Sequence, residues 1–120
     1  MSVTVQIQSV LFNNQNTALV RPLENLQNAM RLDGETNQCV RDAVLICGDA
    51  SPAALFSEEE ITELNSKFDR LSLRYEFFNE NTGTAKGHNR MAKQETSDYI
   101  MIMNPDIIVN PRIFAQLLQP

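Results

Sequence analysis

Four polar segments follow apolar runs in this sequence, and they hold the side chains that could do chemistry. The clearest is Asn104-Pro105-Asp106, which ends the apolar run from Tyr99 to Met103. A carboxylate and an amide oxygen in that position suit a hard divalent cation, which takes oxygen ligands and would in turn hold the oxygens of a diphosphate. The same three residues are also common in ordinary turns, so spacing alone leaves both interpretations open.

The other segments have the same ambiguity. Asp49 follows the run from Ala43 to Cys47, where it could accept a hydrogen bond from a ligand or simply end a strand. The stretch from Asn79 to Arg90 is rich in Asn and Gly, which tolerate left-handed turns with or without a ligand. Its cations, Lys86 and Arg90, suit either a pyrophosphate clamp or a solvated helix face.

Several familiar sites are excluded by their missing residues. The segment Leu11-Phe12-Asn13-Asn14-Gln15 has no glycine, so a dinucleotide fingerprint after the first strand is absent. Gly83 and Gly87 are too close for a Walker loop and are followed by His88 and Asn89. With 1 His in the chain, a His-based zinc site or a hydrolytic triad is not expected.

Composition narrows the class of protein further. The chain has 120 residues, 42% of them apolar, enough for one globular domain whose core needs no disulfide or structural metal. Its 15 acidic and 10 basic residues give a net charge of −5, which argues against nucleic acid as a partner. Cys39 and Cys47 lack metal-ligand spacing, and we expect reduced thiols in a cytoplasmic protein.

No apolar stretch reaches the ~20 residues needed to cross a bilayer. The N-terminus, Met1 to Asn13, alternates apolar and polar residues and is neither a signal peptide nor an anchor.

The elements that must position these segments alternate along the chain. Apolar runs predict strands over Val3–Phe12, Ala43–Cys47, Leu73–Phe78 and Tyr99–Met103, and the second and fourth are continuously apolar, as in strands covered on both faces. Between the first two runs, Leu19, Leu23, Leu26 and Met30 form one helical stripe. That helix begins either near Arg21, with Pro22 in its first turn, or at Asn16 with a kink.

Three further helices are predicted. Ser57 and Glu60 form a capping-box pattern, followed by a stripe of Ile61, Leu64, Phe68 and Leu71. The polar segment 79–90 is expected as a loop that rises into a helix ending near Glu95. Asn110 and Pro111 are expected to start a last helix whose inward face is formed by Ile113, Phe114, Leu117 and Leu118.

This alternation predicts an α/β fold in which helices cover both faces of a mostly parallel sheet. Ligands of such sheets bind beyond the carboxyl ends of the strands, near the point where the winding reverses. The candidate site therefore consists of the four segments that follow the predicted strands: Phe12 to Asn14, Gly48 to Ser51, Asn79 to Asn89 and Asn104 to Asp106.

The chain resembles, over all 120 residues, the N-terminal, nucleotide-binding half of the inverting glycosyltransferases of family 2. Three motifs carry the resemblance, and they occur in the order found in the family. Val10-Leu11-Phe12-Asn13 resembles the family's opening strand. The stretches 81–83 and 87–90 are similar to its Asn-x-Gly and Gly-x-Asn-x-Gly pattern, with Met91 in place of the last glycine. Asp98 to Asp106 resembles the strand that runs into its Asp-x-Asp metal motif, in the subgroup with Asn-Pro-Asp.

The resemblance implies the Rossmann-like half of a GT-A fold, a three-layer sandwich with strand order 3-2-1-4. It implies that Asp106 contacts a divalent metal, Mn or Mg, that bridges the donor diphosphate. Phe12 and Asn13 would border the base and ribose, and Asp49 would accept from a uracil or thymine ring. The nucleotide-sugar site that it implies comprises Phe12, Asn13, Asp49, Asn81, Gly83, Gly87, Asn89 and Asn104.

The implied reaction is transfer of a sugar, with inversion, from a UDP- or dTDP-sugar to a hydroxyl of a saccharide or lipid-linked acceptor, as in polysaccharide biosynthesis. In the family the general base is an acidic residue of the second half of the domain. We therefore expect these 120 residues to be a truncated, donor-binding part with no catalytic residue of its own. The family context implies a cytoplasmic protein or one peripheral to the inner face of the membrane.

Two alternatives remain at this point. One is a non-catalytic α/β module that binds a partner protein or nothing at its strand ends. The other is a nucleotidyltransferase, which is disfavoured because its glycine-rich basic loop should follow the first strand, where Asn13-Asn14-Gln15-Asn16 stands. An interrupted sheet also leaves an unpaired edge, so we expect a homo-oligomer formed through the last helix around Phe114 and Leu118.

Overall fold

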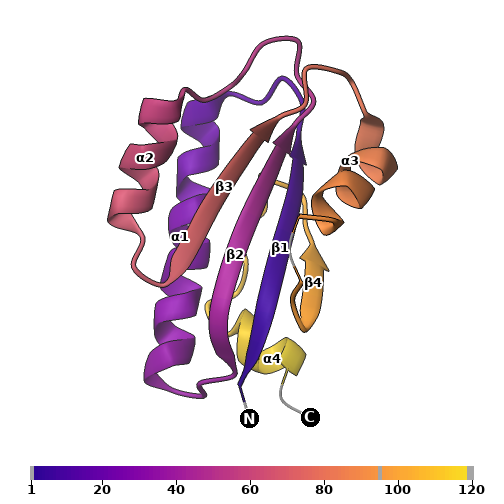
Figure 1. Ribbon diagram of the computed structural model, residues 1–120. Coiled ribbons are helices and arrows are strands. Elements are labelled where there is room, and N and C mark those ends of the chain that lie inside the picture. The colour runs from indigo at the N-terminus through magenta and orange to yellow at the C-terminus, as the bar shows by residue number, and fades with distance from the viewer. Residues whose placement is uncertain (1, 95, 119–120) are drawn as a thin grey trace.

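A sheet of four parallel strands forms the centre of the computed structural model, which describes residues 2–94 and 96–118 (Figure 1). The strands are β1 (Val3–Leu11), β2 (Val40–Asp49), β3 (Leu71–Phe77) and β4 (Tyr99–Ile102). Their order is β3-β2-β1-β4, and every neighbouring pair is parallel. The expected strand order and parallel sheet are confirmed.

Helices cover both faces of the sheet and complete the three layers. The helices are α1 (Asn16–Glu35), α2 (Glu58–Lys67), α3 (Gly83–Ala92) and α4 (Ile113–Leu118). As Figure 1 shows, α1 and α2 lie on one face, and α3 lies on the other. The short α4 contacts α1 and buries Phe114 in the same core. No helix in the described part of the chain combines the length and apolar character that a membrane crossing requires.

The two faces of the sheet bury different amounts of apolar surface. Alternate residues of β1 and β2, among them Val5, Ile7 and Leu45, face α1 and form the larger core. On the α3 face a smaller core consists of Val44, Ile46, Ala50, Phe78 and Met91. Burial of apolar side chains is the main stabilising term in folding, so the α1 face contributes most of the stability.

Local sequence signals explain two helix starts. Ser57 Oγ accepts from the Glu60 backbone N–H at 3.1 Å and the Glu60 carboxylate accepts from the Ser57 N–H at 2.9 Å, which confirms the capping box. Helix α1 begins at Asn16, so Pro22 lies inside the helix and is buried there. The alternative start near Arg21 is therefore wrong.

The expected loop over residues 79–90 is also wrong in its second part. Helix α3 begins at Gly83, so Gly87, His88 and Asn89 lie on a helix. Gly87 packs against β1, and a Cβ there would lie 2.9 Å from Val10 Cγ2. The missing side chain lets α3 approach the sheet, and this packing outweighs the low helix propensity of glycine. The expected end near Glu95 lies outside the described residues.

The C-terminal part of the sheet is less buried than its sequence predicts. Strand β4 was expected to be covered on both faces, but Ile100 is 48% and Ile102 61% exposed, because α3 covers β1 and β2 instead. In α4, Phe114 is buried as expected, whereas Leu117 is 60% exposed and does not face inward. An apolar run alone does not reveal whether a strand lies at an edge.

Gly48 provides a direct test of the packing between α3 and the sheet. A Cβ at this position would lie 2.8 Å from Phe78 Cε2 and 2.9 Å from Met91 Sδ. We expect Gly48→Ala to lower the free energy of unfolding by about 1–3 kcal/mol, the usual cost of overpacking. Chemical denaturation measures it.

The matched control is Gly34→Ala in α1. Its Cβ would meet only the flexible end of Arg70, with Cζ at 3.0 Å, so we expect a change within about 1 kcal/mol. Equal effects of the two substitutions would contradict the close packing at Gly48.

Candidate functional site

The carboxyl ends of β1 and β4 are neighbours, although 90 residues separate them in sequence. The pairing runs from Val5 opposite Tyr99 to Gln8 opposite Ile102. Beyond β4, the Met103 N–H donates to the Gln8 carbonyl at 3.1 Å and Ser9 Oγ donates to the Met103 carbonyl at 2.9 Å. After β3 the chain returns past β1 to form β4, so the winding reverses between β1 and β4. This is the position where open parallel sheets bind ligands.

The segment after β1 presents an aromatic ring to solvent in a fixed backbone conformation. Phe12 is 48% exposed, and its N–H donates to Asn14 Oδ1 at 2.9 Å. Asn13 has φ of 53°, the left-handed region that Asn tolerates, and its N–H donates to Ser51 Oγ at 2.8 Å. Both residues are therefore exposed at the switch point.

Asp49 has a different environment from the one expected for a base-binding residue. The residue is 0% exposed, and its carboxylate accepts from the Ser51 N–H and the Leu55 N–H, each at 2.9 Å, and from the Tyr75 hydroxyl. A carboxylate enclosed by these donors has no free face for a nucleobase. It instead fixes the loop after β2, and through Ser51 it holds the backbone of Asn13.

The segment after β4 leaves its polar side chains in solvent. Asn104 and Asp106 are exposed, and Pro105 between them lines a small apolar cavity with Met103 and Leu11. Pro105 thus anchors the turn on the core while its neighbours stay accessible. In the described residues no three His, Cys, Asp or Glu side chains cluster as a protein-only metal cage would need. Asp106 with Asn104 does fit Mg²⁺, which keeps several waters and binds through one or two carboxylates plus substrate phosphates.

The helix N-termini at this edge of the sheet differ in charge. The first turn of α2 carries Glu58, Glu59 and Glu60, which complement the positive end of the helix dipole. The first turns of α1 and α3 hold no acidic residue, and the side chains of their N-cap residues accept no hydrogen bond from the N–H groups of the helix. Both N-termini nevertheless have a neighbouring acceptor: Asn81 Oδ1 accepts from the Gly83 N–H of α3 at 3.3 Å, and the Glu60 carboxylate lies 3.5 Å from Asn16 Nδ2 at the start of α1.

The four site residues expected between β3 and β4 are spread along α3 and do not form one turn. Asn81 Oδ1 accepts from the Gly83 N–H at 3.3 Å, and Gly83 has φ of 68°. Gly87 is buried in the packing with Val10, whereas Asn89 is exposed. Only Asn81 and Gly83 lie before or at the start of the helix.

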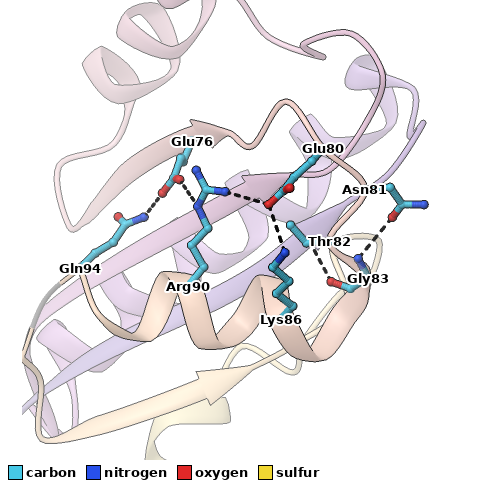
Figure 2. A network of polar contacts seen from close by, with 8 residues as sticks. All are labelled: Glu76, Glu80, Asn81, Thr82, Gly83, Lys86, Arg90 and Gln94. Carbon is cyan, nitrogen blue, oxygen red and sulfur yellow. Dashed lines mark hydrogen bonds and ion pairs between the residues drawn. The ribbon is translucent and has the colours of Figure 1, made fainter.

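The cations of this region are engaged in ion pairs (Figure 2). Arg90 Nε lies 2.7 Å from Glu76 Oε2, and Lys86 Nζ lies 3.5 Å from Glu80 Oε1. Arg90 also contacts Glu80 at 3.4 Å and stands 4.6 Å from the centre of the Phe78 ring. These contacts fasten α3 to the end of β3. Arg90 and Lys86 therefore form a paired helix face and not a preformed pyrophosphate clamp.

A buried polar chain under α3 was not foreseen from the sequence. Gln8 Nε2 lies 3.1 Å from both the ring Nδ1 and the carbonyl oxygen of His88. In this orientation the amide supplies only hydrogens, so Nδ1 is the acceptor and a neutral ring carries its proton on Nε2. Gln6 donates to Gln8 Oε1 at 2.7 Å and to the Met91 carbonyl at 3.1 Å. The signal was present in the alternating glutamines of β1, but alternation is also typical of a half-solvated strand.

Both cysteines are free and buried, as expected for reduced thiols. Burial raises the pKa of Cys47 to about 12, so this thiol is not a nucleophile at neutral pH.

Comparison with known proteins identifies no family: no family model matches the chain, and no curated protein has a significant match to it. The functional assignment therefore depends on the geometry of the switch point and on the resemblance of the motifs.

The bond between Tyr75 and Asp49 generates a prediction about alkaline stability. Burial and the hydrogen bond to Asp49 raise the pKa of Tyr75 to about 12 from its ordinary value of 10.0. Because the folded value is the higher one, this stabilisation is complete below pH 10.0 and is lost as the pH rises through about 12. We expect denaturant midpoints of Tyr75→Phe to fall less steeply over this range than those of the wild type.

The matched control is Tyr99→Phe, which removes the hydroxyl of the other, exposed tyrosine. It should keep the wild-type alkaline profile. If Tyr75→Phe also kept that profile, the bond to Asp49 would not have the assigned effect.

His88 generates a second prediction, which NMR can test without assignment because the chain has 1 His. Burial lowers the pKa of His88 from its ordinary value of 6.5. We expect the ring signals to titrate below pH 6.5 in the folded protein and to return to the ordinary midpoint in denaturant. A folded-state midpoint above 6.5 would show that the ring is not desolvated as described.

Proposed function

We propose that this chain binds the donor of a sugar-transfer reaction, a nucleoside diphosphate sugar, at the switch point between β1 and β4. The observation that carries the proposal is the exposure of Asp106 and Asn104 after β4, next to Phe12 and Asn13 after β1. This edge offers an aromatic surface for a base and oxygen ligands for a metal. The strand order matches the one that the resemblance to glycosyltransferases of family 2 implies.

Charge supports the same location. The chain has a net charge of −5, and its cations on α3 are paired with Glu76 and Glu80. A diphosphate therefore needs a metal ion and backbone N–H groups for its neutralisation. The first turns of α1 and α3, which hold no acidic residue, are the nearest source of such groups, whereas the three glutamates at the start of α2 would repel an anion.

Each residue has a defined part in this proposal. Phe12 stacks on the base, and Asn13 contacts the ribose. Asp106, with Asn104 beside it, holds a Mg²⁺ or Mn²⁺ ion, which when bound neutralises charge on the diphosphate leaving group. Asp49 takes no direct part, and its hydrogen bonds through Ser51 keep Asn13 in position.

The proposed reaction is attack of an acceptor hydroxyl on the anomeric carbon with inversion. The bond from that carbon to the diphosphate breaks as the new glycosidic bond forms. The described residues contribute donor binding, and we assign no general base among them.

Isothermal calorimetry with UDP and dTDP, with and without Mn²⁺, tests this proposal. We expect weak binding without metal, which strengthens when Mn²⁺ is added and returns to the weak value when a chelator removes the metal. Asp106→Ala should weaken metal-dependent binding about tenfold or more, equal to about 1.4 kcal/mol. Phe12→Ala should weaken binding in the presence and absence of metal, because it removes stacking.

The control is Asp42→Ala, which removes the same charge from an exposed carboxylate near the amino end of β2. It should bind like the wild type. Absence of a metal-dependent heat in the wild type would favour the non-catalytic module. Equal losses in Asp106→Ala and Asp42→Ala would reject Asp106 as the metal ligand.

A further inference from the structure

The loop after β2 runs beside the segment after β1, on the side of the donor site where the base is proposed to bind (Figure 1). Two hydrogen bonds hold them together. The Asn13 N–H donates to Ser51 Oγ at 2.8 Å, and Asn16 Nδ2 donates to the Leu55 carbonyl at 3.1 Å. The loop between Ser51 and Leu55 therefore flanks Phe12.

The exposed side chains of this loop are apolar. Pro52, Ala53 and Ala54 are all exposed, and none has a hydrogen-bonding group in its side chain. With the half-exposed ring of Phe12 they form what we call the base surface. Such a surface attracts a base through stacking and van der Waals contact. Every nucleobase has a π face, so this attraction does not depend on the groups along the edge of the base.

Asp49, the carboxylate beside the base surface, is committed to the protein. Its Oδ1 accepts from the Ser51 N–H and its Oδ2 from the Leu55 N–H, each at 2.9 Å, and Oδ2 also accepts from the Tyr75 hydroxyl. The residue is 0% exposed. To accept the N3–H of a uracil ring, Asp49 would have to give up one of these bonds and leave a buried donor unpaired, which is costly. Uracil therefore gains no advantage from Asp49 over another base.

The exposed polar side chains that follow Phe12 are amides. Asn13 and Gln15 are exposed, and the Gln15 side chain makes no capping bond at the start of α1. An amide carries both a donor NH₂ and an acceptor oxygen, and an exposed one can rotate to present either. These two side chains can therefore match the edge of a pyrimidine or of a purine.

We infer that the donor site accepts nucleoside diphosphates whatever their base, and that it binds purine ones most tightly because a purine has the larger face for stacking. This inference deepens the proposed function and rests on it. A site with fixed hydrogen bonds to one base rejects others by about 10⁴-fold or more, because its own polar groups are left unpaired. Where stacking dominates, the range of stacking energies limits the difference between bases to about thirtyfold.

Isothermal calorimetry of the whole chain with UDP, CDP, ADP and GDP, each with Mn²⁺, tests the inference. We expect all four nucleotides to bind with Kd values within about thirtyfold of one another, ADP and GDP most tightly. Phe12→Ala should weaken all four about fivefold or more, and the purines most. The matched control is Tyr99→Ala, which removes a 54% exposed ring at the opposite end of the sheet and should leave all four Kd values unchanged.

Asp49→Asn separates support of the loop from recognition of the base. Uracil has a donor at N3 and cytosine an acceptor, so a carboxylate that bound this position would favour UDP over CDP, and the amide would reduce that preference. We expect the ratio of UDP to CDP affinity to stay unchanged, even if both affinities fall because the loop loosens. The ratio in the wild type does not depend on how any variant folds.

The outcomes distinguish this inference from the proposed function. A preference of the wild type for one base above about a hundredfold would overturn the inference and leave the donor site in place. A changed ratio of UDP to CDP affinity in Asp49→Asn would do the same. Failure of all four nucleotides to bind with Mn²⁺ would overturn the proposed function and this inference with it.

Discussion

The structure depends on the pairing of β1 with a parallel strand on each side. With β2 and β3 on one side of it, β1 can be central only if the chain crosses back over the sheet to form β4. That reversal brings the end of β1 beside the end of β4 and so places Phe12 and Asn13 near Asp106. The buried Asp49 adds the finer constraint, because it holds Ser51, whose hydroxyl fixes the backbone of Asn13.

Much of this fold could be predicted from the sequence, because its signals are local. The apolar runs identified four strands, and the pattern Ser57 to Glu60 identified the start of α2. The errors occurred where distant packing decides the outcome. The sequence predicts a turn at Gly87. In the structure Gly87 lies on a helix, where the close approach of Val10 and Phe78 leaves no room for a Cβ. The apolar sequence of β4 predicts a buried strand. Because α3 lies over β1 and β2, Ile100 and Ile102 of β4 are exposed instead.

The location of the candidate site could be predicted from the sequence, but the contacts of its individual side chains could not, because those contacts depend on distant residues. The chain order brings Phe12, Asn13, Asn104 and Asp106 to one edge, and the winding rule for parallel sheets predicts that edge. Whether an aspartate at a strand end faces a ligand or its own loop depends on residues far along the chain. For Asp49 the decisive partner is the Tyr75 hydroxyl, 26 residues later. The pairing of Gln8 with His88 spans 80 residues, and its one local signal, the alternation of glutamines in β1, is equally typical of a half-solvated strand.

The central claim is that a divalent ion and a diphosphate meet at the β1–β4 switch point. Paramagnetic broadening by Mn²⁺ in the presence of UDP tests it most directly, because the effect decreases steeply with distance from the ion. We predict that the amide signals of Asn13, Asn104 and Asp106 broaden first, while those of Glu58 to Glu60 on α2 stay sharp. Selective broadening at the α2 glutamates, or no site-specific broadening at all, would contradict this account.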